Sequence, residues 1–528
     1  MSDLLHSLIL DSANAKPDKP ALIHKSTQLN YAELASVVEQ TATGLLAHGL
    51  LHNERLGIYL PKLPESVATF FATTLAGGVF VPINPLLKAP QVGYILQDCN
   101  VRVLVTSKDR YEQLKDILPQ CHHLQTIVLV NCADENLPQD QSFNFLTWQQ
   151  LTDNDRTNTR KQRIDSDMAA ILYTSGSTGK PKGVVLSHKN MVSGAKSVAQ
   201  YLNNSADDKL LAVLPFSFDY GFSQLSTAFH TGASVMLMDY LLPRDVIKAI
   251  AREQVTGLAG VPPLWNQLAQ LEWPSKAVDS LRYMTNSGGA MPKATLQRLR
   301  SALPNSDFYL MYGLTEAFRS TYLPPHEIDN RPDSIGKAIP NAEVMVVRED
   351  GSPCAPGEPG ELVHRGALVA MGYWNDPTKT AERFKPAPNQ DKALSLTEIA
   401  VWSGDNVKMD EDGYLYFVGR KDDMIKTSGY RVSPTEIEEV IYASKLVSEI
   451  VALGIPHPTL GQGIVVIATA SQNQELDSDA ILNHCKKELP NFMLPLAIEK
   501  ADSLPRNPNG KIDRKLLSNE YQDIFQQT

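Results

Sequence analysis

The stretch "YTSGSTGKPKGVVLSHKN", residues 173–190, has the composition of a loop that holds phosphate. Its ten positions from Thr174 to Gly183 contain three glycines, four hydroxyl side chains and two lysines. Glycines let backbone N–H groups turn toward an anion, and serine and threonine hydroxyls donate further hydrogen bonds. The pattern predicts a phosphate-binding loop, and a flexible linker is the alternative reading of the same composition.

This loop differs from the common phosphate loop of nucleoside triphosphatases. That motif reads G-x-x-x-x-G-K-[ST], and its final hydroxyl binds magnesium. Here only two residues separate Gly176 from Gly179, and Pro181, which has no hydroxyl, follows Lys180. The sequence therefore excludes that motif and indicates a different phosphate chemistry.

Around this loop, short β-branched runs alternate with amphipathic helical stretches. Two examples of the helical pattern are "PRDVIKAIARE" (243–253) and "PKATLQRLRSAL" (292–303), each opened by a proline that suits a first helical turn. Strand–helix alternation predicts an α/β fold of parallel-rich sheets layered with helices. The expected buried strands are 78–84, 101–107, 126–130, 168–175, 210–215, 233–239 and 281–287.

The C-terminal part has a different organisation. After "GRKDDMIKTSGY" (419–430), a helix is expected to start with a capping box of Ser433 and Glu436. Strand-like 449–455 and 463–470, followed by helical 479–489, complete a small α+β unit. The predicted division is a large N-terminal domain over 1–420 and a small mobile domain over 421–528.

Composition restricts the class of protein. The chain has 528 residues, 43% hydrophobic and 20% charged, with a net charge of −10, as is typical of a globular protein of two or more domains. An acidic chain without a basic block is a poor binder of nucleic acid. No apolar run approaches the roughly 18 residues of a membrane span. Five scattered cysteines and no basic leader favour a cytoplasmic protein with reduced thiols and no structural zinc.

The loop resembles the signature of the AMP-forming adenylating enzymes, namely acyl-CoA synthetases, nonribosomal peptide adenylation domains and luciferases. Further motifs of that superfamily follow in the expected order along nearly the whole chain. The pattern looks especially like the ligases found with exosortase systems and like stand-alone aminoacyl-carrier-protein ligases. The matching motifs are "NSGGAMP" (286–292), "YGLTEA" (312–317), "VWSGD" (401–405), "GRKDDMIKTSGYRVSP" (419–434) and "LPRNPNGKIDR" (504–514).

The resemblance implies a reaction in two halves that uses ATP and Mg²⁺. A carboxylate attacks the α-phosphate and releases pyrophosphate, and a thiol then displaces AMP from the acyl-adenylate. Glu316 is expected to hold Mg²⁺ and Thr315 to contact the α-phosphate, although Thr315 in isolation also suits a plain helix cap. The residues expected to surround the pyrophosphate are Thr174, Ser175, Gly176, Ser177, Thr178, Gly179 and Lys182.

Further positions match the nucleotide site of the superfamily. The "SGGA" glycines let the main chain lie beside adenine, with Tyr312 as a stacking partner. Asp405 is the expected ribose ligand and Arg420 reaches the ribose or the phosphate, whereas a lone Asp or Arg is more often a surface residue. The residues in this set are Ser287, Gly288, Gly289, Ala290, Tyr312, Gly313, Asp405 and Arg420.

By the same resemblance, Lys511 is the catalytic lysine that bridges the substrate carboxylate and the α-phosphate. Taken alone, a lysine in such a loop is a solvated charge. Asp422 matches the hinge about which the small domain swings between the half-reactions, withdrawing Lys511 and bringing in "SGYRVSP".

The acid pocket is expected around "LPFSFDYGFSQL" (214–225). Many acyl-CoA synthetases carry a histidine where this chain has Phe218, whereas amino-acid adenylating domains show Phe-Asp. Asp219 either binds the ammonium group of an amino acid or caps a helix that begins at Tyr220. Phe218, Phe222, Trp265 and Met311, together with Phe216, are candidate pocket residues or plain core residues. Arg319 and Gln462 have no role that follows from residue type.

The acceptor implied by the resemblance is the thiol of CoA or of a phosphopantetheine arm, so an acyl carrier protein is one expected partner. An amino acid is favoured as the acid if Asp219 binds an amine, and a fatty or other organic acid if Asp219 is a cap. A luciferase-like or amide-forming enzyme and a non-catalytic nucleotide-binding module are the remaining alternatives. The chain is expected to act as a monomer or homodimer.

Overall fold

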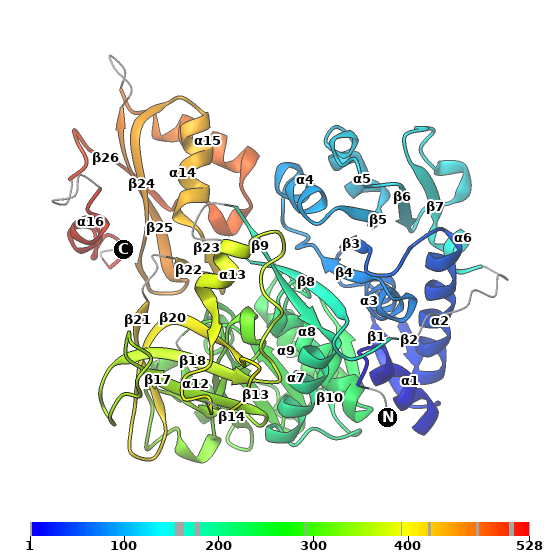
Figure 1. Cartoon of the computed structure of the whole chain (residues 1–528), viewed down its shortest axis with the longest axis horizontal. Coiled ribbons are helices and arrows are strands. Elements are labelled where there is room, and N and C mark those ends of the chain that lie inside the picture. Colours follow the sequence, from blue (N-terminus) through cyan, green and yellow to red (C-terminus); the bar gives the residue numbers. More distant parts are fainter. Residues whose placement is uncertain are drawn as a thin grey trace.

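The computed structural model describes residues 3–153, 163–174, 180–289, 291, 293–391, 393–420, 424–470, 475–505 and 512–526. It confirms the predicted α/β architecture, with a large N-terminal region of sheets and helices and a smaller C-terminal part (Figure 1). We call the described residues up to 420 the large lobe and those from 424 onward the small lobe. No helix in the described ranges is long and apolar enough to cross a membrane.

The first sheet of the large lobe is parallel except at one edge, where β8 and β9 run antiparallel and frame the glycine-rich loop. Thr174 at the end of β8 is paired with Lys182 at the start of β9. In spatial order the described strands are β7 (Asn144–Thr147), β6 (Thr126–Val130), β5 (Val101–Ser107), β3 (Arg55–Tyr59), β4 (Val79–Pro82), β8 (Met168–Thr174) and β9 (Lys182–Ser187).

The second sheet has a parallel half, from β1 to β14, and an antiparallel half that begins at β15. The described order is β17 (Ala342–Val347), β18 (Gly360–Gly366), β20 (Ile399–Met409), β21 (Leu415–Arg420), β16 (Ser334–Ala338), β15 (Thr321–Leu323), β14 (Asp307–Tyr312), β13 (Tyr283–Asn286), β12 (Gly257–Gly260), β10 (Lys209–Ala212), β11 (Ser234–Leu237), β1 (Pro20–His24) and β2 (Thr27–Asn30), with β19 (Phe384–Pro386) beside β20.

Helices pack on the sheets of the large lobe, and α3 and α8 contact each other through aromatic rings. Phe70 and Phe71 of α3 lie 5.5 and 6.1 Å from Phe222 of α8, measured between ring centroids. The helices are α1 (Ser7–Ala15), α2 (Tyr31–Ala47), α3 (Pro64–Ala76), α4 (Ala89–Asp98), α5 (Lys108–Leu114), α6 (Trp148–Thr152), α7 (His188–Tyr201), α8 (Asp219–Thr231), α9 (Pro243–Glu253), α10 (Pro262–Leu268), α11 (Ser275–Ser280), α12 (Lys293–Ala302) and α13 (Pro377–Arg383).

The small lobe is built on its own sheet of β23 (Tyr430–Val432), β22 (Ile425–Thr427), β25 (Gly461–Ala470) and β24 (Val447–His457), with β26 (Ala497–Lys500) beside β25. One core cluster joins this sheet to α14 (Pro434–Ala443) and α15 (Ser478–Glu488). A second cluster joins it to α16 (Arg514–Glu520).

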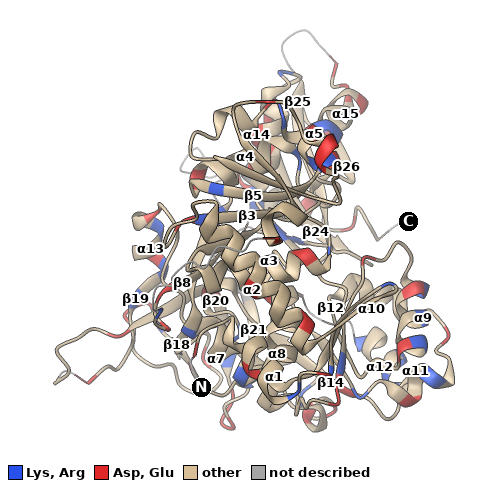
Figure 2. Cartoon of the chain, turned by 90° about the vertical axis from the view of Figure 1, so that its right-hand side faces the viewer, with Lys and Arg blue, Asp and Glu red and all other residues tan. Residues whose placement is uncertain are grey.

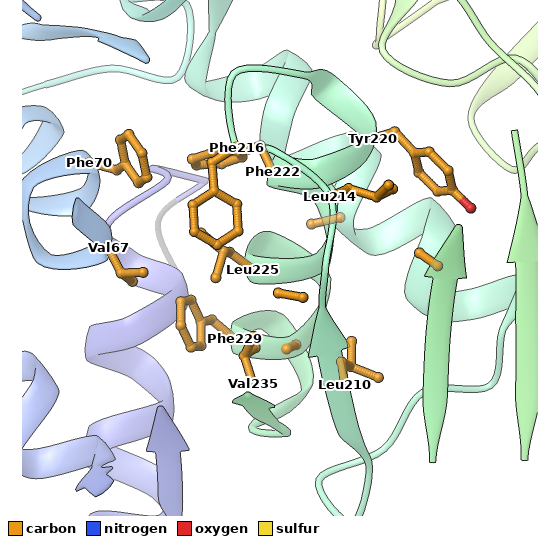
Figure 3. Packing of buried hydrophobic residues seen from close by; sticks show 14 of the residues in the cluster. Val67, Phe70, Leu210, Leu214, Phe216, Tyr220, Phe222, Leu225, Phe229 and Val235 are labelled. Carbon is orange, nitrogen blue, oxygen red and sulfur yellow. The ribbon is translucent and has the colours of Figure 1, made fainter. Parts of the chain in front are cut away.

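Charged side chains of both signs are mixed on outer helices. Figure 2 shows both colours on α9, which carries basic Arg244, Lys248 and Arg252 and acidic Asp245 and Glu253. Inside the large lobe, Phe216, Phe222, Leu225 and Phe229 pack together near Phe70, whereas Tyr220 points away from them toward neighbouring strands (Figure 3). This difference in direction within α8 separates the core from the site described below.

Candidate active site

Two loops at the carboxyl ends of neighbouring strands begin the site. Strands β12, β13 and β14 are parallel, so the segments that follow β13 and β14 emerge at the same edge of the sheet. The first segment holds Ser287, Gly288 and Gly289, and the second holds Gly313 and the 3₁₀ turn η3 (Thr315–Ala317). The structure therefore brings together two stretches that the sequence matched to one nucleotide site.

Glu316 is a buried carboxylate in η3, with 9% of its surface exposed. The hydroxyl of Tyr373 donates a hydrogen bond to its Oε1 at 2.6 Å. Tyr373 is delivered by a segment that runs beside β9, since the N–H of Val185 donates to the carbonyl of Gly372. The loss of solvation of this phenol, beside the Glu316 carboxylate, raises the pKa of Tyr373, so the phenol stays a neutral donor.

Lys182 lies on the other side of the same tyrosine. Its Nζ is 5.5 Å from the centroid of the Tyr373 ring. Burial lowers the pKa of Lys182, and the nearby cations Lys379 and Arg383 lower it further, whereas Asp376 and Glu316 raise it. A half-buried cluster of like charges suits an anionic ligand, because the ligand relieves their mutual repulsion.

Two of these cations, Lys379 and Arg383 of α13, were missed by the sequence reasoning. They lie in "NDPTKTAERFKPAPNQDKALS" (375–395), a polar, proline-bearing stretch that matches no motif quoted above. Arg383 packs over Gly404, whose φ of +70° favours glycine. The sequence did contain a signal for these two cations. They are basic residues four positions apart on a short helix, and this spacing places both side chains on one face of the helix.

Asp405 is 4% exposed and accepts a hydrogen bond from the Tyr312 hydroxyl at 2.5 Å. Its backbone is paired with that of Arg420 across β20 and β21. Tyr312 is the last residue of β14, so this contact joins the parallel and antiparallel halves of the second sheet. The structure thus places Asp405 and Tyr312, which are 93 residues apart, in one corner of the site.

The segment after β13 has a backbone that needs glycine. Gly288 has a φ of +79°, and a Cβ on Gly289 would approach Cγ of Pro262 to 3.1 Å. The side chain of Asn286 donates to the carbonyl of Gly289 at 3.0 Å, which fixes the turn. A flat, side-chain-free backbone at this edge fits the predicted position of a planar base.

Several predicted site residues lie outside the described residues. These are Ser175, Gly176, Ser177, Thr178, Gly179, Ala290, Asp422 and Lys511, and the side chain of Arg420 is also outside the description. Thr174, at the end of β8, is the last described residue before the loop.

A pocket lies next to these loops, between one face of α8 and one face of the parallel strands. The helix contributes Tyr220, Ser223, Gln224 and Thr227, which recur at the spacing of a single helical face. Its empty volume, including the part open to solvent, is about 360 Å³. The other lining residues are Val198, Leu202, Leu210, Gly257, Ala259, Tyr283, Thr285, Met311 and Arg319.

Of the proposed pocket residues, Met311 lines this space, whereas the others do not, namely Phe216, Phe218, Asp219, Phe222 and Trp265. Phe222 is on the opposite face of α8 and packs 5.1 Å from Phe80 between ring centroids (Figure 3). Trp265 is fully buried under Gly260, where a Cβ would come within 2.7 Å of its ring. The assignment of these two residues to the pocket is therefore wrong, because helix periodicity turns Phe222 into the core and Trp265 packs beneath a strand end.

Asp219 meets a cation of the chain itself. Nη1 of Arg319 is 3.0 Å from Oδ2 of Asp219, and the side chains of Arg319 and Asp219 are 2% and 15% exposed, respectively. The other oxygen, Oδ1, is 3.4 Å from the Thr315 hydroxyl. Burial raises the pKa of Asp219, and Arg319 opposes this effect.

The cap interpretation of Asp219 also changes. Helix α8 begins at Asp219 and not at Tyr220, its N-cap is Phe218, and no side chain caps it. The negative charge of Asp219 in the first turn still complements the N-terminal end of the helix dipole. Its side chain pairs with Arg319 instead of capping the helix.

The hairpin of β22 and β23 places small-lobe residues against the large lobe. The ring of Tyr430 is 5.0 Å from that of Phe218, between centroids, and a Cβ on Gly429 would come within 3.0 Å of Val261. Gly429 also has a φ of +82°. The segment "SGYRVSP" therefore contacts the large lobe at Phe218 and Val261.

The expected capping box of α14 is not formed. Ser433 is the N-cap, but its side chain makes no cap bond. Glu436 instead accepts a hydrogen bond from Nε2 of Gln91 in α4, at 3.0 Å across the two lobes. Burial raises the pKa of Glu436 to about 7. The capping prediction was wrong because this tertiary contact takes the side chain that a cap would use.

Gln462 has a structural position. Its Oε1 accepts from the Lys426 N–H at 2.7 Å, and its Nε2 donates to the Gly454 carbonyl at 3.1 Å. The side chain thereby ties β22 to β24 within the small lobe.

Comparison with known proteins agrees with this geometry. Two family models match the chain, the AMP-binding enzyme over residues 9–374 and the AMP-binding enzyme C-terminal domain over residues 436–511. A long-chain-fatty-acid–CoA ligase of Bacillus subtilis (strain 168) is 27% identical over 547 residues, covering 98% of this chain and 94% of that protein.

A linear gramicidin synthase subunit of Brevibacillus parabrevis is 29% identical over 518 residues, or 97% of this chain, which spans only 6% of that protein. The structure of a double mutant of o-succinylbenzoate CoA synthetase from Bacillus subtilis, bound with a product analogue, has a TM-score of 0.82 at 24% identity and shares the fold. That match covers 97% of this chain and 98% of the other. The chain therefore belongs to the AMP-binding enzyme family, and is an AMP-forming adenylating ligase.

Proposed function

We propose that this ligase uses ATP to adenylate a carboxylic acid, with release of pyrophosphate, and then transfers the acyl group to a thiol. The thiol is that of CoA or of a carrier protein's phosphopantetheine. One observation carries the proposal: the Lys182–Tyr373–Glu316 group and the Asp405–Tyr312 pair flank Thr315, whose hydroxyl contacts Asp219, the ion-pair partner of the pocket residue Arg319. The first half-reaction, adenylation of the acid, needs sites for the two phosphates of pyrophosphate, for the ribose and for the acid.

The described residues take the following roles in the first half. Lys182, with Lys379 and Arg383 behind it, receives the negative charge of the departing pyrophosphate. Asp405 accepts from the ribose hydroxyls, and Tyr312 orients its carboxylate. Thr315 stands between these groups and Asp219, at the junction where acid and α-phosphate must meet.

Glu316 fits Mg²⁺. Among the described residues only Tyr373 hydrogen-bonds this carboxylate, through Oε1, and no group of three His, Cys, Asp or Glu side chains is arranged to hold a metal. Magnesium prefers one carboxylate with waters and phosphate oxygens over an all-protein cage. When bound, the ion would neutralise phosphate charge.

The two lobes divide the two half-reactions in this proposal. The large lobe binds ATP and acid, and the small lobe supplies Lys511 for adenylation and then turns about Asp422. The contacts of Tyr430 with Phe218 and of Gly429 with Val261 support the present arrangement as the one for thiol transfer.

The acid is not required to be an amino acid. The amino-acid interpretation rested on a buried Asp219 without a cation, and Arg319 is that cation. Relatives of both kinds, a CoA ligase and a peptide-synthetase subunit, match the chain. We therefore propose a general organic acid, and treat an amine on it as a variable of the experiment.

The experiment follows exchange of labelled pyrophosphate into ATP with Mg²⁺ and a panel of amino, fatty and dicarboxylic acids. An active acid is then supplied with CoA or a phosphopantetheinylated carrier protein, and AMP and thioester are measured. We expect exchange with at least one acid and thioester with one acceptor. Exchange with no acid, or formation of ADP, would contradict the proposal.

Lys511→Ala tests the division of labour. We expect this variant to lose exchange by about 10³-fold while it retains thiol transfer from a supplied acyl-adenylate, because only the first step needs the lysine. Lys486→Ala, an exposed lysine on α15, is the matched control and should leave both steps unchanged. Equal loss of both steps in Lys511→Ala would exclude the proposed turn of the small lobe.

A further inference from the structure

Arg319 uses only part of its guanidinium group within the chain. Nη1 donates to Oδ2 of Asp219 at 3.0 Å and to the Phe318 carbonyl at 3.3 Å. Nε and Nη2 have no hydrogen-bond partner among the described residues, although the side chain is only 2% exposed and lines the acid pocket. A buried donor without a partner is costly, so these two atoms are candidates to bind a ligand.

The two free donors form a chemically specific pair. Nε and Nη2 lie on one edge of the planar guanidinium and point in parallel, which is the geometry that binds both oxygens of a carboxylate. Nη1, on the other edge, is already held by Asp219. We call Nε and Nη2 the free edge of Arg319.

The free edge is held rigidly. The backbone N–H of Arg319 donates a hydrogen bond to the Ala317 carbonyl at 2.5 Å. This bond closes a tight turn around Phe318, whose φ is +55°. Positive φ in a bulky residue is strained and persists where the surroundings impose it. The guanidinium carbon also lies 4.5 Å from the centroid of the Tyr220 ring. Such fixed donors lose little entropy when a ligand binds.

Asp219 separates the free edge from the reacting end of the site. Its Oδ1 faces Thr315, next to the phosphate side, and its Oδ2 faces Arg319. The carboxylate that reacts must lie on the Thr315 side to reach the α-phosphate. A group bound to the free edge is therefore a second group on the acid, deeper in the pocket.

Beside its apolar lining, the pocket holds two further polar atoms without described partners on the α8 side. Gln224 Oε1 and Thr227 Oγ1, on the same face of α8, also lack partners among the described residues. Asp219 and Thr227 are eight residues apart, or about 12 Å along the helix. A simple fatty acid would leave all these polar atoms unpaired, at a cost for each.

We propose that the acid of this ligase carries a second carboxylate, which binds across Nε and Nη2 of Arg319. The proposal rests on the proposed function and names its substrate class: short dicarboxylic acids, with or without an amine. Arg319 is then the residue that determines specificity, and Asp219 holds it in place.

The test is pyrophosphate exchange over matched pairs of acids. Butanoate is compared with butanedioate, pentanoate with pentanedioate, and 2-aminobutanoate with aspartate, so that the second carboxylate and the amine vary separately. We expect kcat/KM to be at least about tenfold higher for a dicarboxylic acid than for its matched monocarboxylic acid. Exchange with monocarboxylic acids only would overturn this inference and leave the proposed function standing, whereas exchange with no acid would remove both.

Variants identify the residue responsible. Arg319→Gln should abolish the preference by raising KM for the dicarboxylic acid at least tenfold, with KM for ATP unchanged, and Arg319→Lys should restore only part of it, since lysine has no planar edge. Arg252→Gln, an exposed arginine of α9, is the control. An unchanged preference in Arg319→Gln would overturn the proposal.

A second variant guards against loss of folding, since Arg319→Gln leaves Asp219 buried without its cation. The double variant Asp219→Asn, Arg319→Gln lacks both charges. Its melting temperature should therefore equal that of the wild type. Its exchange should show no preference for dicarboxylic acids. A retained preference in this double variant would equally overturn the assignment of Arg319.

Discussion

Glu316 and Arg319 are three residues apart, yet they belong to two differently built regions. Glu316 faces the nucleotide side, where Tyr373 donates to it, and Arg319 faces the acid pocket, where it pairs with Asp219. The nucleotide side consists of short loops at strand ends. The acid side is made from one face of α8 and one face of the neighbouring strands. The comparison teaches that, in the proposed function, local segments hold the nucleotide chemistry, whereas the choice of acid depends on faces formed by residues far apart in sequence.

The largest expected effect is the loss of pyrophosphate exchange on substitution of Glu316, which tests whether the nucleotide region acts independently of the acid pocket. Glu316→Gln keeps an acceptor for the Tyr373 hydroxyl but loses the charge that Mg²⁺ needs. We expect exchange to fall by about 10²–10³-fold, and by the same factor for every acid in the panel. The measurement is kcat/KM for each acid at saturating ATP.

Glu411→Gln, at an exposed turn, is the control and should behave as wild type. A loss that varied strongly from one acid to another would mean that Glu316 also shapes the acid pocket. The separation of the nucleotide region from the acid pocket would then be contradicted.

A smaller effect distinguishes the two faces of α8. Phe222→Leu should lower the free energy of unfolding by about 1–2 kcal/mol, because it leaves a gap beside Phe80, without changing the preferred acid. Tyr220→Phe removes a hydrogen bond to Thr285 and should raise KM for the acid several-fold, at a cost of about 1 kcal/mol.

For both variants, urea unfolding measures the free energy of unfolding, and the exchange assay measures KM for each acid. If Phe222→Leu changed the choice of acid and Tyr220→Phe did not, the assignment of Phe222 to the core and of Tyr220 to the pocket would be wrong.

The smallest effect concerns the contact between the lobes. The pKa of Glu436 is raised to about 7 by burial, against an ordinary value of 4.5. A carboxyl with a raised pKa keeps its proton when docked and loses it when exposed, so docking weakens as pH rises from about 4.5 to about 7. The radius of gyration from small-angle scattering should increase slightly over this range.

Glu436→Gln cannot ionise, and its scattering should not change with pH. A wild-type curve that is flat, or one that Glu436→Gln reproduces, would show that the Gln91–Glu436 contact does not control the lobes. The effect is modest because other contacts, such as Phe218 with Tyr430, also join them.

The sequence predicted the strands and helices of the large lobe well, because β-branched runs and helical spacing are local signals. The interpretation of 243–253 as a helix is matched by α9 (Pro243–Glu253), and the strand expected at 126–130 is β6 (Thr126–Val130). Motif resemblance alone assigned Asp405 and Tyr312 to one nucleotide site, since nothing local links residues 93 positions apart, and it did not predict the hydrogen bond between them.

The misses have a common cause. Phe222, Trp265, Ser433 and Arg319 were judged by residue type and chain position, whereas their roles depend on which neighbour the fold supplies. Counting the helical period from Asp219 would have placed Tyr220, Gln224 and Thr227 on the pocket face and Phe222 opposite. No comparable count links Arg319 to Asp219, because the two are 100 residues apart and a strained turn at Phe318 sets the position of Arg319.

That turn also constrains how the enzyme diversifies. The Phe318 ring rests on Gly194 of α7, where a Cβ would come within 2.4 Å of it, so the loop is clamped from behind. In the proposed function, Glu316, for Mg²⁺, and Arg319, for the acid, lie on either side of the clamp and share one backbone path. On that proposal, a new acid is accommodated by exchanging the side chain at position 319 and not by shifting the loop, since movement there would disturb Glu316 at the same time.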